Sequence, residues 1–349
     1  MTEPLNDLMH CALPKTEPKP LPAGLGDMQT SAIVLVGNKW INGTDITYFF
    51  KDIGANRWPK AQKQVVQAAF AKWKAQGIGL TFTEVANEVN AILKIGFVQG
   101  DGSWSYVGTD VNKYQHGGRN MNFGWDLTTP WGHATALHEI GHAIGMPHEH
   151  QSPLSGIVWN EANVLAAFKG PPNNWSEDTI HWNILRHLSQ SEVQGSSWDP
   201  KSIMHYPFEA KMIQAPAPWN KSGTSPNTEL SANDIAFVQR FYPPLPAAPA
   251  MPEGTLVPIS DATGDQADFS FTPTETRDYR IQAVGEADIK LALSELAEDG
   301  VNRMLRIADD SGKPVNAAIT AGLEAGKVYT IHARTYFAGA PSKPHLVML

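Results

Sequence analysis

Two histidines, His138 and His142, stand four residues apart, with Glu139 directly after the first of them. On an α-helix, residues four apart lie on one face, so both imidazoles can offer a nitrogen to a single metal ion. Glu139 can then reach a water molecule on that ion. Gly145 allows a left-handed turn at the end of the helix, after which His148 can return as a third ligand. Three neutral imidazoles and one open position are the ligand set of a catalytic zinc site.

A simpler interpretation treats these histidines as unrelated side chains of a helix. The short H-E-x-x-H pattern does arise by chance, but its extension through Gly145 to His148 makes chance a poor explanation. A structural zinc site would be closed by a fourth ligand, often a cysteine, and the single cysteine, Cys11, is far away in the sequence. The pattern therefore favours a catalytic site with one Zn²⁺ per chain.

A second motif follows the zinc pattern and reads Ser202-Ile203-Met204-His205-Tyr206. The extended zinc signature of the metzincin proteases requires such a later methionine turn. The segment G-S-W-S-Y-V-G at 102–108 and the pairs Leu230-Ser231 and Asp234-Ile235 complete the set. With these motifs the chain resembles the astacin zinc endopeptidases (family M12A), over roughly residues 24–243.

The resemblance implies a zinc metalloendopeptidase (hydrolase class EC 3.4.24) that cleaves protein or peptide substrates. Its zinc ligands would be His138, His142 and His148. Glu139 would act as general base toward the metal-activated water and would then return the proton to the leaving amine. Tyr206 would bind zinc at rest and stabilise the oxyanion during the reaction.

The resemblance also implies supporting roles around the metal. Met204 would form an apolar floor beneath the ion, and Glu149 would hold a structural polar contact near the mature N-terminus. Substrate would add to the sheet as an antiparallel strand. The edge strand that receives it would contain Ser103, Trp104, Ser105 and Tyr106.

The chain departs from the family in two respects. Animal astacins continue after the third histidine with a run rich in Arg and Asp, whereas this chain continues E-H-Q-S-P-L-S-G at 149–156. Their substrate specificity is therefore not expected here. A single cysteine also excludes the two disulfides of the family, which indicates a bacterial-type member.

Residues 1–30 are rich in Pro, Lys and Glu and predict an extended arm, a candidate inhibitory pro-segment. Astacins are commonly kept inactive by a pro-segment aspartate, and Asp27 in Gly24-Leu25-Gly26-Asp27 aligns with that motif, although its Phe is absent. Cys11 is the second candidate latency ligand, because a thiolate binds zinc well. The alternatives are an ordinary turn residue at Asp27 and an ordinary free thiol at Cys11.

The fold expected for residues 31–244 is α+β and astacin-like, with a twisted mixed sheet, two long helices and an irregular C-terminal subdomain. Apolar alternation predicts strands at 31–40, 45–50, 80–85, 91–98 and 102–108. Helical spacing predicts the two long helices at 60–76 and 132–145, and further helical segments near 160–168 and 178–193.

A proline-rich linker is expected at 245–254, followed by an accessory domain at 255–349. Its short strand-like runs, separated by turns, predict an antiparallel β-sandwich. This region is similar to the bacterial pre-peptidase C-terminal domain. Asp309 and Asp310, which precede Ser311-Gly312, are interpreted as turn residues, and calcium is not predicted.

The charge and hydropathy patterns limit the classes of binding partner. The net charge is -8 and no basic run mixes with aromatic residues, so nucleic-acid binding is not expected. No apolar stretch is long enough to span a membrane. The start of the sequence lacks an ordinary signal peptide, which predicts a protein that is cytoplasmic or exported by a leaderless route. The sequence does not determine the oligomeric state, and a monomer is expected.

Two other functions remain compatible with the motifs. One is a binding or adhesion protein that keeps an idle zinc site, and the other is a zinc hydrolase that acts on something other than protein. The presence of both Glu139 and Tyr206 argues against an idle site. Met204 and an edge strand suited to extended peptides favour a peptidase.

Overall fold

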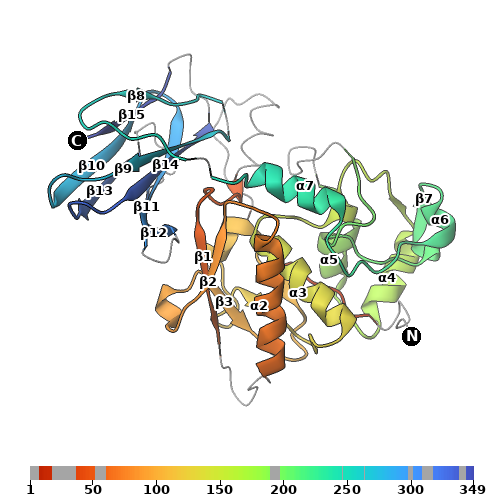
Figure 1. Cartoon of the computed structure of the whole chain (residues 1–349). Coiled ribbons are helices and arrows are strands. Elements are labelled where there is room, and N and C mark those ends of the chain that lie inside the picture. The colour runs from red at the N-terminus through yellow and green to blue at the C-terminus, as the bar shows by residue number, and fades with distance from the viewer. Residues whose placement is uncertain are drawn as a thin grey trace. The chain divides into compact units, whose positions relative to one another are not determined.

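The computed structural model describes residues 8–17, 37–51, 60–188, 197–245, 247–262, 264–297, 302–308, 317–337 and 343–349 (Figure 1). These residues divide into two compact units. The first unit comprises Met1–Pro18, Ile46–Gln76 and Phe82–Phe241, and the second comprises Lys19–Asp45, Gly77–Thr81 and Tyr242–Leu349. The domain boundaries expected from the sequence stay a prediction.

A five-stranded mixed sheet has the strand order β2-β1-β3-β5-β4. β1 pairs with β3 and β3 with β5 in parallel, whereas β4 runs antiparallel to β5 at the edge. The mixed sheet and the edge position of β4 confirm the predicted architecture. β5 was not predicted, because two residues are too few to show an alternating pattern. The strands are β1 (Asp45–Phe50), β2 (Thr81–Glu84), β3 (Leu93–Gly96), β4 (Trp104–Ser105) and β5 (Met121–Asn122).

Two long helices, α2 (Lys60–Lys74) and α3 (Pro130–Ala143), confirm the predicted pair. α2 buries one apolar face, and its Trp73 indole donates a hydrogen bond to the Leu137 carbonyl oxygen of α3 at 3.0 Å. α3 begins after Thr129, whose hydroxyl accepts the Gly132 amide at 3.0 Å, a standard helix N-cap. α3 is buried along most of its length, so its position in the first unit is firmly set.

After α3 the first unit consists of short elements, as expected for an irregular subdomain. The helix predicted at 178–193 is shorter than expected, because α5 continues into one π-helical turn at His181–Leu185 and Arg186 is extended. Residues 189–193 of that prediction lie outside the described residues. The short elements include β6 (Val158–Trp159), α4 (Glu161–Lys169), α5 (Glu177–Ile180), β7 (Ile213–Ala215), α6 (Trp219–Ser222) and α7 (Ala232–Phe241).

Several sequence predictions fall wholly or partly outside the described residues. These are the arm beyond residue 17, including Asp27, the first six residues of the strand predicted at 31–40, and the turn at Asp309 and Asp310. Within the described part of 31–40, residues 37–40 form a turn and coil and no strand.

The second unit contains two four-stranded antiparallel sheets, with strand orders β13-β10-β15-β8 and β12-β11-β14-β9. Buried residues of both sheets, among them Phe271, Tyr279 and Ile331, form one hydrophobic core, which confirms the predicted β-sandwich. β13 was missed because its sequence AITAGL is rich in small residues with low strand propensity. The strands are β8 (Val257–Pro258), β9 (Gln266–Phe271), β10 (Arg277–Val284), β11 (Asp288–Leu296), β12 (Asn302–Ala308), β13 (Ala318–Leu323), β14 (Tyr329–Phe337) and β15 (His345–Met348).

The short segment 39–43 belongs to the second unit through specific hydrogen bonds. The Arg334 guanidinium donates to the carbonyl oxygens of Trp40 at 2.6 Å and of Lys39 at 3.0 Å. Gly43 adopts a φ of 95° and lies so close to β14 that a Cβ there would be 2.8 Å from Cε1 of His332. Glycine is therefore required at this position, and the segment covers buried polar groups of the sheet.

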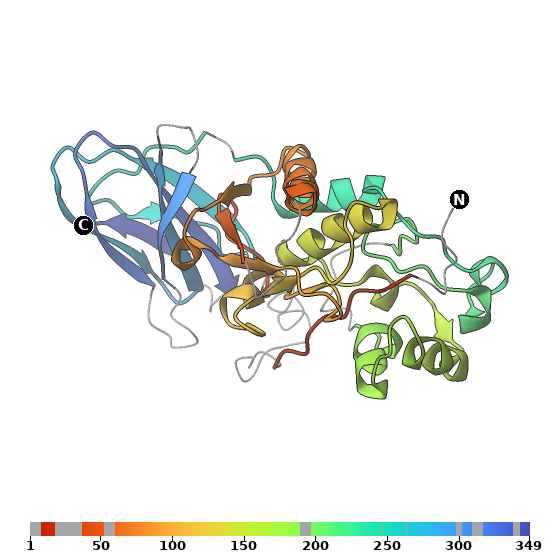
Figure 2. The same cartoon turned by 90° about the horizontal axis from the view of Figure 1, so that it is seen from below.

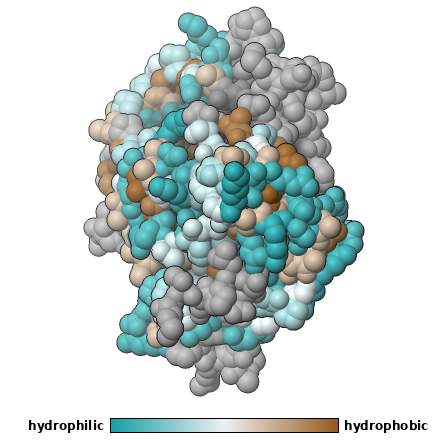
Figure 3. All heavy atoms as spheres, turned by 90° about the vertical axis from the view of Figure 1, so that its right-hand side faces the viewer, coloured by the Kyte–Doolittle hydropathy of each residue, from teal (hydrophilic) through white to brown (hydrophobic). Residues whose placement is uncertain are grey.

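No helix within the described ranges is long and apolar enough to cross a membrane. On the face shown in Figure 3, apolar side chains form small separate patches among hydrophilic ones. That face, in its described part, offers no broad apolar docking surface.

Candidate metal centre

His138 and His142 lie one helical turn apart on α3, with their ring centroids 4.5 Å apart and their planes perpendicular. Nδ1 of His138 lies 2.8 Å from the Ile203 carbonyl oxygen, and Nδ1 of His142 lies 2.7 Å from that of Met146. These bonds place the proton on Nδ1 of each ring. Both Nε2 atoms are buried and have no hydrogen-bond partner among the described residues. Carbonyl bonds of this kind orient metal-binding histidines.

The helix ends at a glycine turn that returns the chain to the same place. Gly145 has a φ of 102°, and its amide bonds to the His142 carbonyl oxygen at 2.8 Å. His148 follows Met146 by two residues. Its ring centroid lies 4.7 Å from that of His142 and 5.4 Å from that of His138. The left-handed turn, which costs glycine little, thus brings the third imidazole to the other two.

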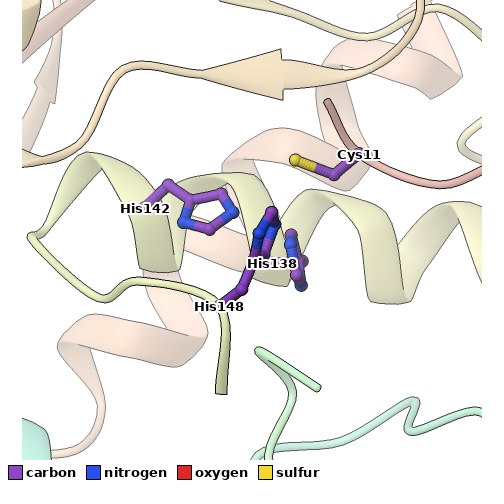
Figure 4. Close-up of side chains that lie close together, drawn as sticks. All are labelled: Cys11, His138, His142 and His148. Atoms are coloured by element: carbon purple, nitrogen blue, oxygen red, sulfur yellow. The ribbon is translucent and has the colours of Figure 1, made fainter. Parts of the chain in front are cut away.

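Cys11 of the N-terminal arm completes the cluster. One candidate ligand atom from each of Cys11, His138, His142 and His148 lies within 4.8 Å of the others, and all four residues are buried. Figure 4 shows the imidazoles converging from α3 and the following loop, with the sulfur turned toward them. Three nitrogens and one sulfur, without carboxylate or carbonyl donors, suit Zn²⁺ rather than Ca²⁺ or Mg²⁺.

Burial controls the charge state of this site. It lowers the pKa of His138 to about 4 and the pKa values of His142 and His148 well below their usual range. The rings are therefore neutral at pH 7, as metal ligands must be. Burial and the nearby Glu139 carboxyl raise the pKa of the Cys11 thiol. A bound dication would reverse that effect and favour the thiolate.

Glu139 lies beside the cluster and is fully buried. Its Oε2 accepts a hydrogen bond from the Cys11 thiol at 3.5 Å, whereas its Oε1 has no partner among the described residues. Burial raises the pKa of Glu139 to about 8. A carboxyl group with this pKa can take up and release a proton near neutral pH.

The Met204 turn lies under α3 and is held by a carboxylate. Asp234 of α7 accepts hydrogen bonds from the Ser202 hydroxyl at 2.6 Å and from the Ile203 amide at 2.8 Å. A Cβ at Gly141 would lie 2.5 Å from Sδ of Met204, so α3 and the turn are in close contact. The sequence flagged Asp234 only as part of a motif. Its link to the turn joins residues far apart in the chain and could not be seen from the sequence.

Tyr206 connects the metal cluster with the arm. Its hydroxyl lies 2.8 Å from Nε2 of His148 and donates a hydrogen bond to the Cys11 carbonyl oxygen. Burial raises the pKa of this phenol well above its usual value. In this arrangement Tyr206 is a neutral donor to a peptide carbonyl group.

The arm lies along β4 and between α3 and the region of α4 and α5 (Figure 2, dark red). The Ala12 amide bonds to the Ser103 carbonyl oxygen at 3.1 Å, next to Trp104 and Ser105 of β4. The Leu13 amide bonds to Oδ1 of Asn183 at 2.8 Å on the opposite side. The arm thus occupies the position predicted for an extended substrate. Tyr106, the last of the predicted edge residues, is buried just after β4.

Glu149 lines a second cavity, which also borders His148 and Met204. Its Oε1 accepts the Asp199 amide at 2.9 Å, and burial raises the pKa of Glu149 to about 8. The cavity has a volume of about 290 Å³ and is also lined by Asp199, Asp234 and Arg240.

The geometry can now be compared with known proteins. A family model described as Astacin (Peptidase family M12A) matches residues 33–164, which include the three histidines. A solved structure of myroilysin is 33% identical and has a TM-score of 0.52, and the match covers 60% of this chain and 97% of that one. This chain belongs to the astacin family. Membership supports zinc metallopeptidase activity on proteins or peptides for this astacin.

Other relatives match more weakly. A crystal structure of myroilysin is 30% identical, covers 70% of this astacin and 97% of its own chain, and has a TM-score of 0.45. Protein SpAN of Strongylocentrotus purpuratus is 28% identical over 191 residues, and the chain spans 28% of its length. A pre-peptidase C-terminal domain from a Bacillus anthracis collagenase has a TM-score of 0.24 at 15% identity. The β-sandwich assignment therefore rests on the strand pairing itself.

Proposed function

We propose that the chain is a zinc endopeptidase that its own N-terminal arm keeps latent. The observation that supports this most is the convergence of three buried histidines, whose candidate ligand atoms lie within 4.8 Å of one another, beside the buried carboxyl of Glu139. A structural site would not need that carboxyl. The family supports zinc metallopeptidase activity. The proposal adds a general base, an oxyanion donor and an inhibitory zinc ligand in the arm.

The proposed ligands of one Zn²⁺ are His138, His142 and His148. When bound, zinc lowers the pKa of a water molecule and polarises a substrate carbonyl group. The Ile203 and Met146 carbonyl oxygens hold two of the rings in the orientation needed. Met204 closes the site from below as an apolar floor, packed against Gly141.

Glu139 is the proposed general base. Its Oε1 is buried and has no partner among the described residues, so it can accept the proton of an attacking water. The same carboxyl would then give this proton to the leaving amine, because burial raises its pKa to about 8 and brings proton transfer near neutral pH. Cys11 now occupies its other oxygen, which indicates that the arm must leave before this exchange can occur.

Tyr206 is the proposed oxyanion donor. It already donates to a peptide carbonyl oxygen, that of Cys11, at the position that a scissile carbonyl would take. A donor at this place typically contributes about 10²-fold or more to the rate. Its contact with Nε2 of His148 also keeps it close enough to bind the metal at rest, as the family resemblance implies.

Latency is proposed to arise from Cys11 and from the strand position of the arm. The thiolate would close the fourth position of the zinc, as in closed tetrahedral sites. The Ala12 amide already uses the Ser103 carbonyl oxygen, so a substrate strand cannot pair there at the same time. Asp27, the other candidate latency ligand, lies outside the described residues. Substrate is proposed to use Trp104, Ser105 and Tyr106 in the same way once the arm has left.

After removal of the arm, the cavity at Glu149 is the proposed seat of the new amino terminus. Its carboxylates, from Glu149, Asp199 and Asp234, would attract an ammonium group. This role keeps Glu149 in structure rather than in catalysis.

Cleavage of casein by the full-length protein, by a variant lacking residues 1–30 and by Glu139→Ala in both forms would test the proposal. Zinc content is measured for each preparation. We expect one zinc per chain throughout, cleavage that increases when the arm is removed, and loss of cleavage with Glu139→Ala or a chelator. A zinc-loaded truncated protein that cleaves no peptide would instead favour a binding protein with an idle site.

A further inference from the structure

The arm places one side chain, His10, in a pocket next to the metal cluster. Its imidazole meets the edges or faces of three rings at centroid distances of 5.0 Å for Phe168, 5.0 Å for Tyr206 and 6.3 Å for Trp131. The side chain is almost completely buried. We refer to the space around it, lined by these rings and by the first two turns of α3, as the His10 pocket.

The backbone of the arm is anchored on both sides of this ring. The His10 amide bonds to Oδ1 of Asn173 at 2.9 Å, and the Met9 carbonyl oxygen accepts the Trp131 indole at 3.0 Å. The ring itself is held differently, because neither imidazole nitrogen makes a hydrogen bond of ordinary geometry with the described residues. The pocket therefore holds His10 by ring packing and not by charge.

The lining of the pocket explains this preference. It contains no lysine or arginine among the described residues, and its polar groups are mostly used elsewhere. The Thr135 hydroxyl accepts the Trp125 indole and donates to the Trp131 carbonyl oxygen. An acidic side chain would find no lysine or arginine here and would meet the Glu139 carboxyl in the wall, so its burial would be costly.

Three buried polar atoms of the lining have no hydrogen-bond partner among the described residues: Nε2 of His138, Oε1 of Glu139 and Nε2 of His205. The first two belong to the metal cluster and its base, and the His205 ring packs against Trp198 and Phe208. About 20 Å³ of free space remains in the pocket beside His10, which is enough for one water or one hydroxyl group.

We propose that the His10 pocket selects a neutral aromatic residue next to the scissile bond. This inference rests on the proposed peptidase function. The arm reports on substrate because it uses the Ser103 carbonyl oxygen and the Tyr206 hydroxyl, the same two groups that a substrate would use. The residue next to the one at the metal then enters this pocket.

A flat aromatic side chain suits the three rings around His10, which the imidazole meets edge to face. A phenylalanine at this position would keep such ring contacts and would bury no polar atom.

The first test follows the arm by labelling Cys11, the single cysteine of the chain, with a thiol reagent in full-length protein. His10→Tyr and His10→Phe should label no faster than the wild type. His10→Ala should label about tenfold faster and His10→Asp about a hundredfold faster, since each tenfold corresponds to about 1.4 kcal/mol. The matched control is Lys15→Ala, an exposed arm residue in a surface ion pair, which should stay within about twofold. Equal rates for all His10 variants would overturn the proposal.

The second test is the pattern of cleavage in a peptide mixture by the full-length His10→Asp protein. We expect Tyr and Phe to be enriched at one position flanking the cut and acidic residues to be depleted there. A flat pattern on both sides of the cut would disprove the selection of substrates. If zinc-loaded protein cleaves nothing, the peptidase proposal fails. The labelling rates of the His10 variants would then still show whether the pocket prefers neutral aromatic side chains.

Discussion

The thiol of Cys11 lies 3.5 Å from Oε2 of Glu139, although 128 residues separate the two in the chain. The contact engages the proposed base and places the sulfur among the three histidines. Under the proposed latency, this side chain would oppose catalysis in two ways, as a fourth donor to zinc and as a partner of the carboxyl that must remain free. The arm would then compete with substrate for the same site.

The first prediction is that Cys11→Ser activates the full-length protein. A hydroxyl is a much weaker zinc ligand than a thiolate, so the arm should leave the cleft more often. We expect casein cleavage to rise about tenfold or more, corresponding to about 1.4 kcal/mol of lost arm binding. Initial rates are compared with those of Lys15→Ala, which should resemble the wild type. Equal rates for Cys11→Ser and wild type would show that the thiol is not the latch.

The second prediction concerns Tyr206, tested in the Cys11→Ser background so that the arm does not mask the effect. Tyr206→Phe should lower kcat about 10²-fold, because the oxyanion loses a donor. Zinc content and folding should be unchanged, because the ring still packs against His148 and His150. Tyr48→Phe, in β1 and stacked on Phe70, is the matched control and should keep most of the activity. A similar kcat for both variants would contradict the role of the Tyr206 hydroxyl.

The third prediction follows the contact from Asp234 to the metal cluster. Asp234 holds the Ile203 amide, and the Ile203 carbonyl oxygen orients His138. Asp234→Asn should therefore weaken zinc binding about 10- to 100-fold, the usual effect of losing an outer partner of a metal ligand. Competition with a fluorescent zinc chelator measures the affinity. Asn233→Ala, at the exposed neighbour, should leave it unchanged, and the same affinity for both variants would refute the link.

The approach of the three histidines could be predicted from the sequence because their contacts are local, and their binding of zinc stays a prediction. His138 and His142 are joined by helix geometry, and Gly145 makes the return to His148 short. The contacts between residues far apart in the chain could not be predicted in this way. The place of Cys11 beside Glu139 and the bond from Asp234 to the Ile203 amide depend on tertiary folding, which residue spacing does not reveal.

The fold was predictable to the extent that its elements were long. Helices α2 and α3 and most sandwich strands have enough residues to show a period. The segment 178–193 also had helical spacing, but its helix ends at Leu185. Near that end, Oδ1 of Asn183 accepts a hydrogen bond from the Leu13 amide of the arm. The attachment of residues 39–43 to the second unit depends on carbonyl oxygens bound by Arg334, and backbone acceptors leave no trace in the sequence.

The fourth prediction is that Gly141→Ala destabilises the first unit, although alanine normally favours a helix over glycine. The added Cβ would lie 2.5 Å from Sδ of Met204 and 3.5 Å from the Trp73 ring, so the methionine must move in a buried space. Overpacking of this kind costs about 1–3 kcal/mol. Thermal unfolding should show a lower Tm. Gly170→Ala, whose Cβ would meet only backbone oxygens at 3.7 and 3.9 Å, should show little change.

The last prediction concerns the second unit and its pH dependence. Burial, followed by the nearby Arg334 guanidinium, lowers the pKa of Lys39 from 10.5 to about 8. Below pH 8 both the folded and unfolded chains carry the proton, so the folded state bears the full cost of the buried charge. Between pH 8 and 10.5 the folded state has released a proton that the unfolded state still holds, and stability must rise with pH.

Replacing this lysine should remove that pH dependence. Lys39→Met should therefore be more stable than the wild type at about pH 7.5, and its advantage should shrink as the pH approaches about 10, because the wild type then loses its buried charge. Urea midpoints for both proteins at several pH values measure the difference. Lys343→Met, at an exposed position of the same unit, should differ from the wild type by a constant amount. A constant difference for Lys39→Met as well would mean that Lys39 keeps an ordinary pKa in the folded protein.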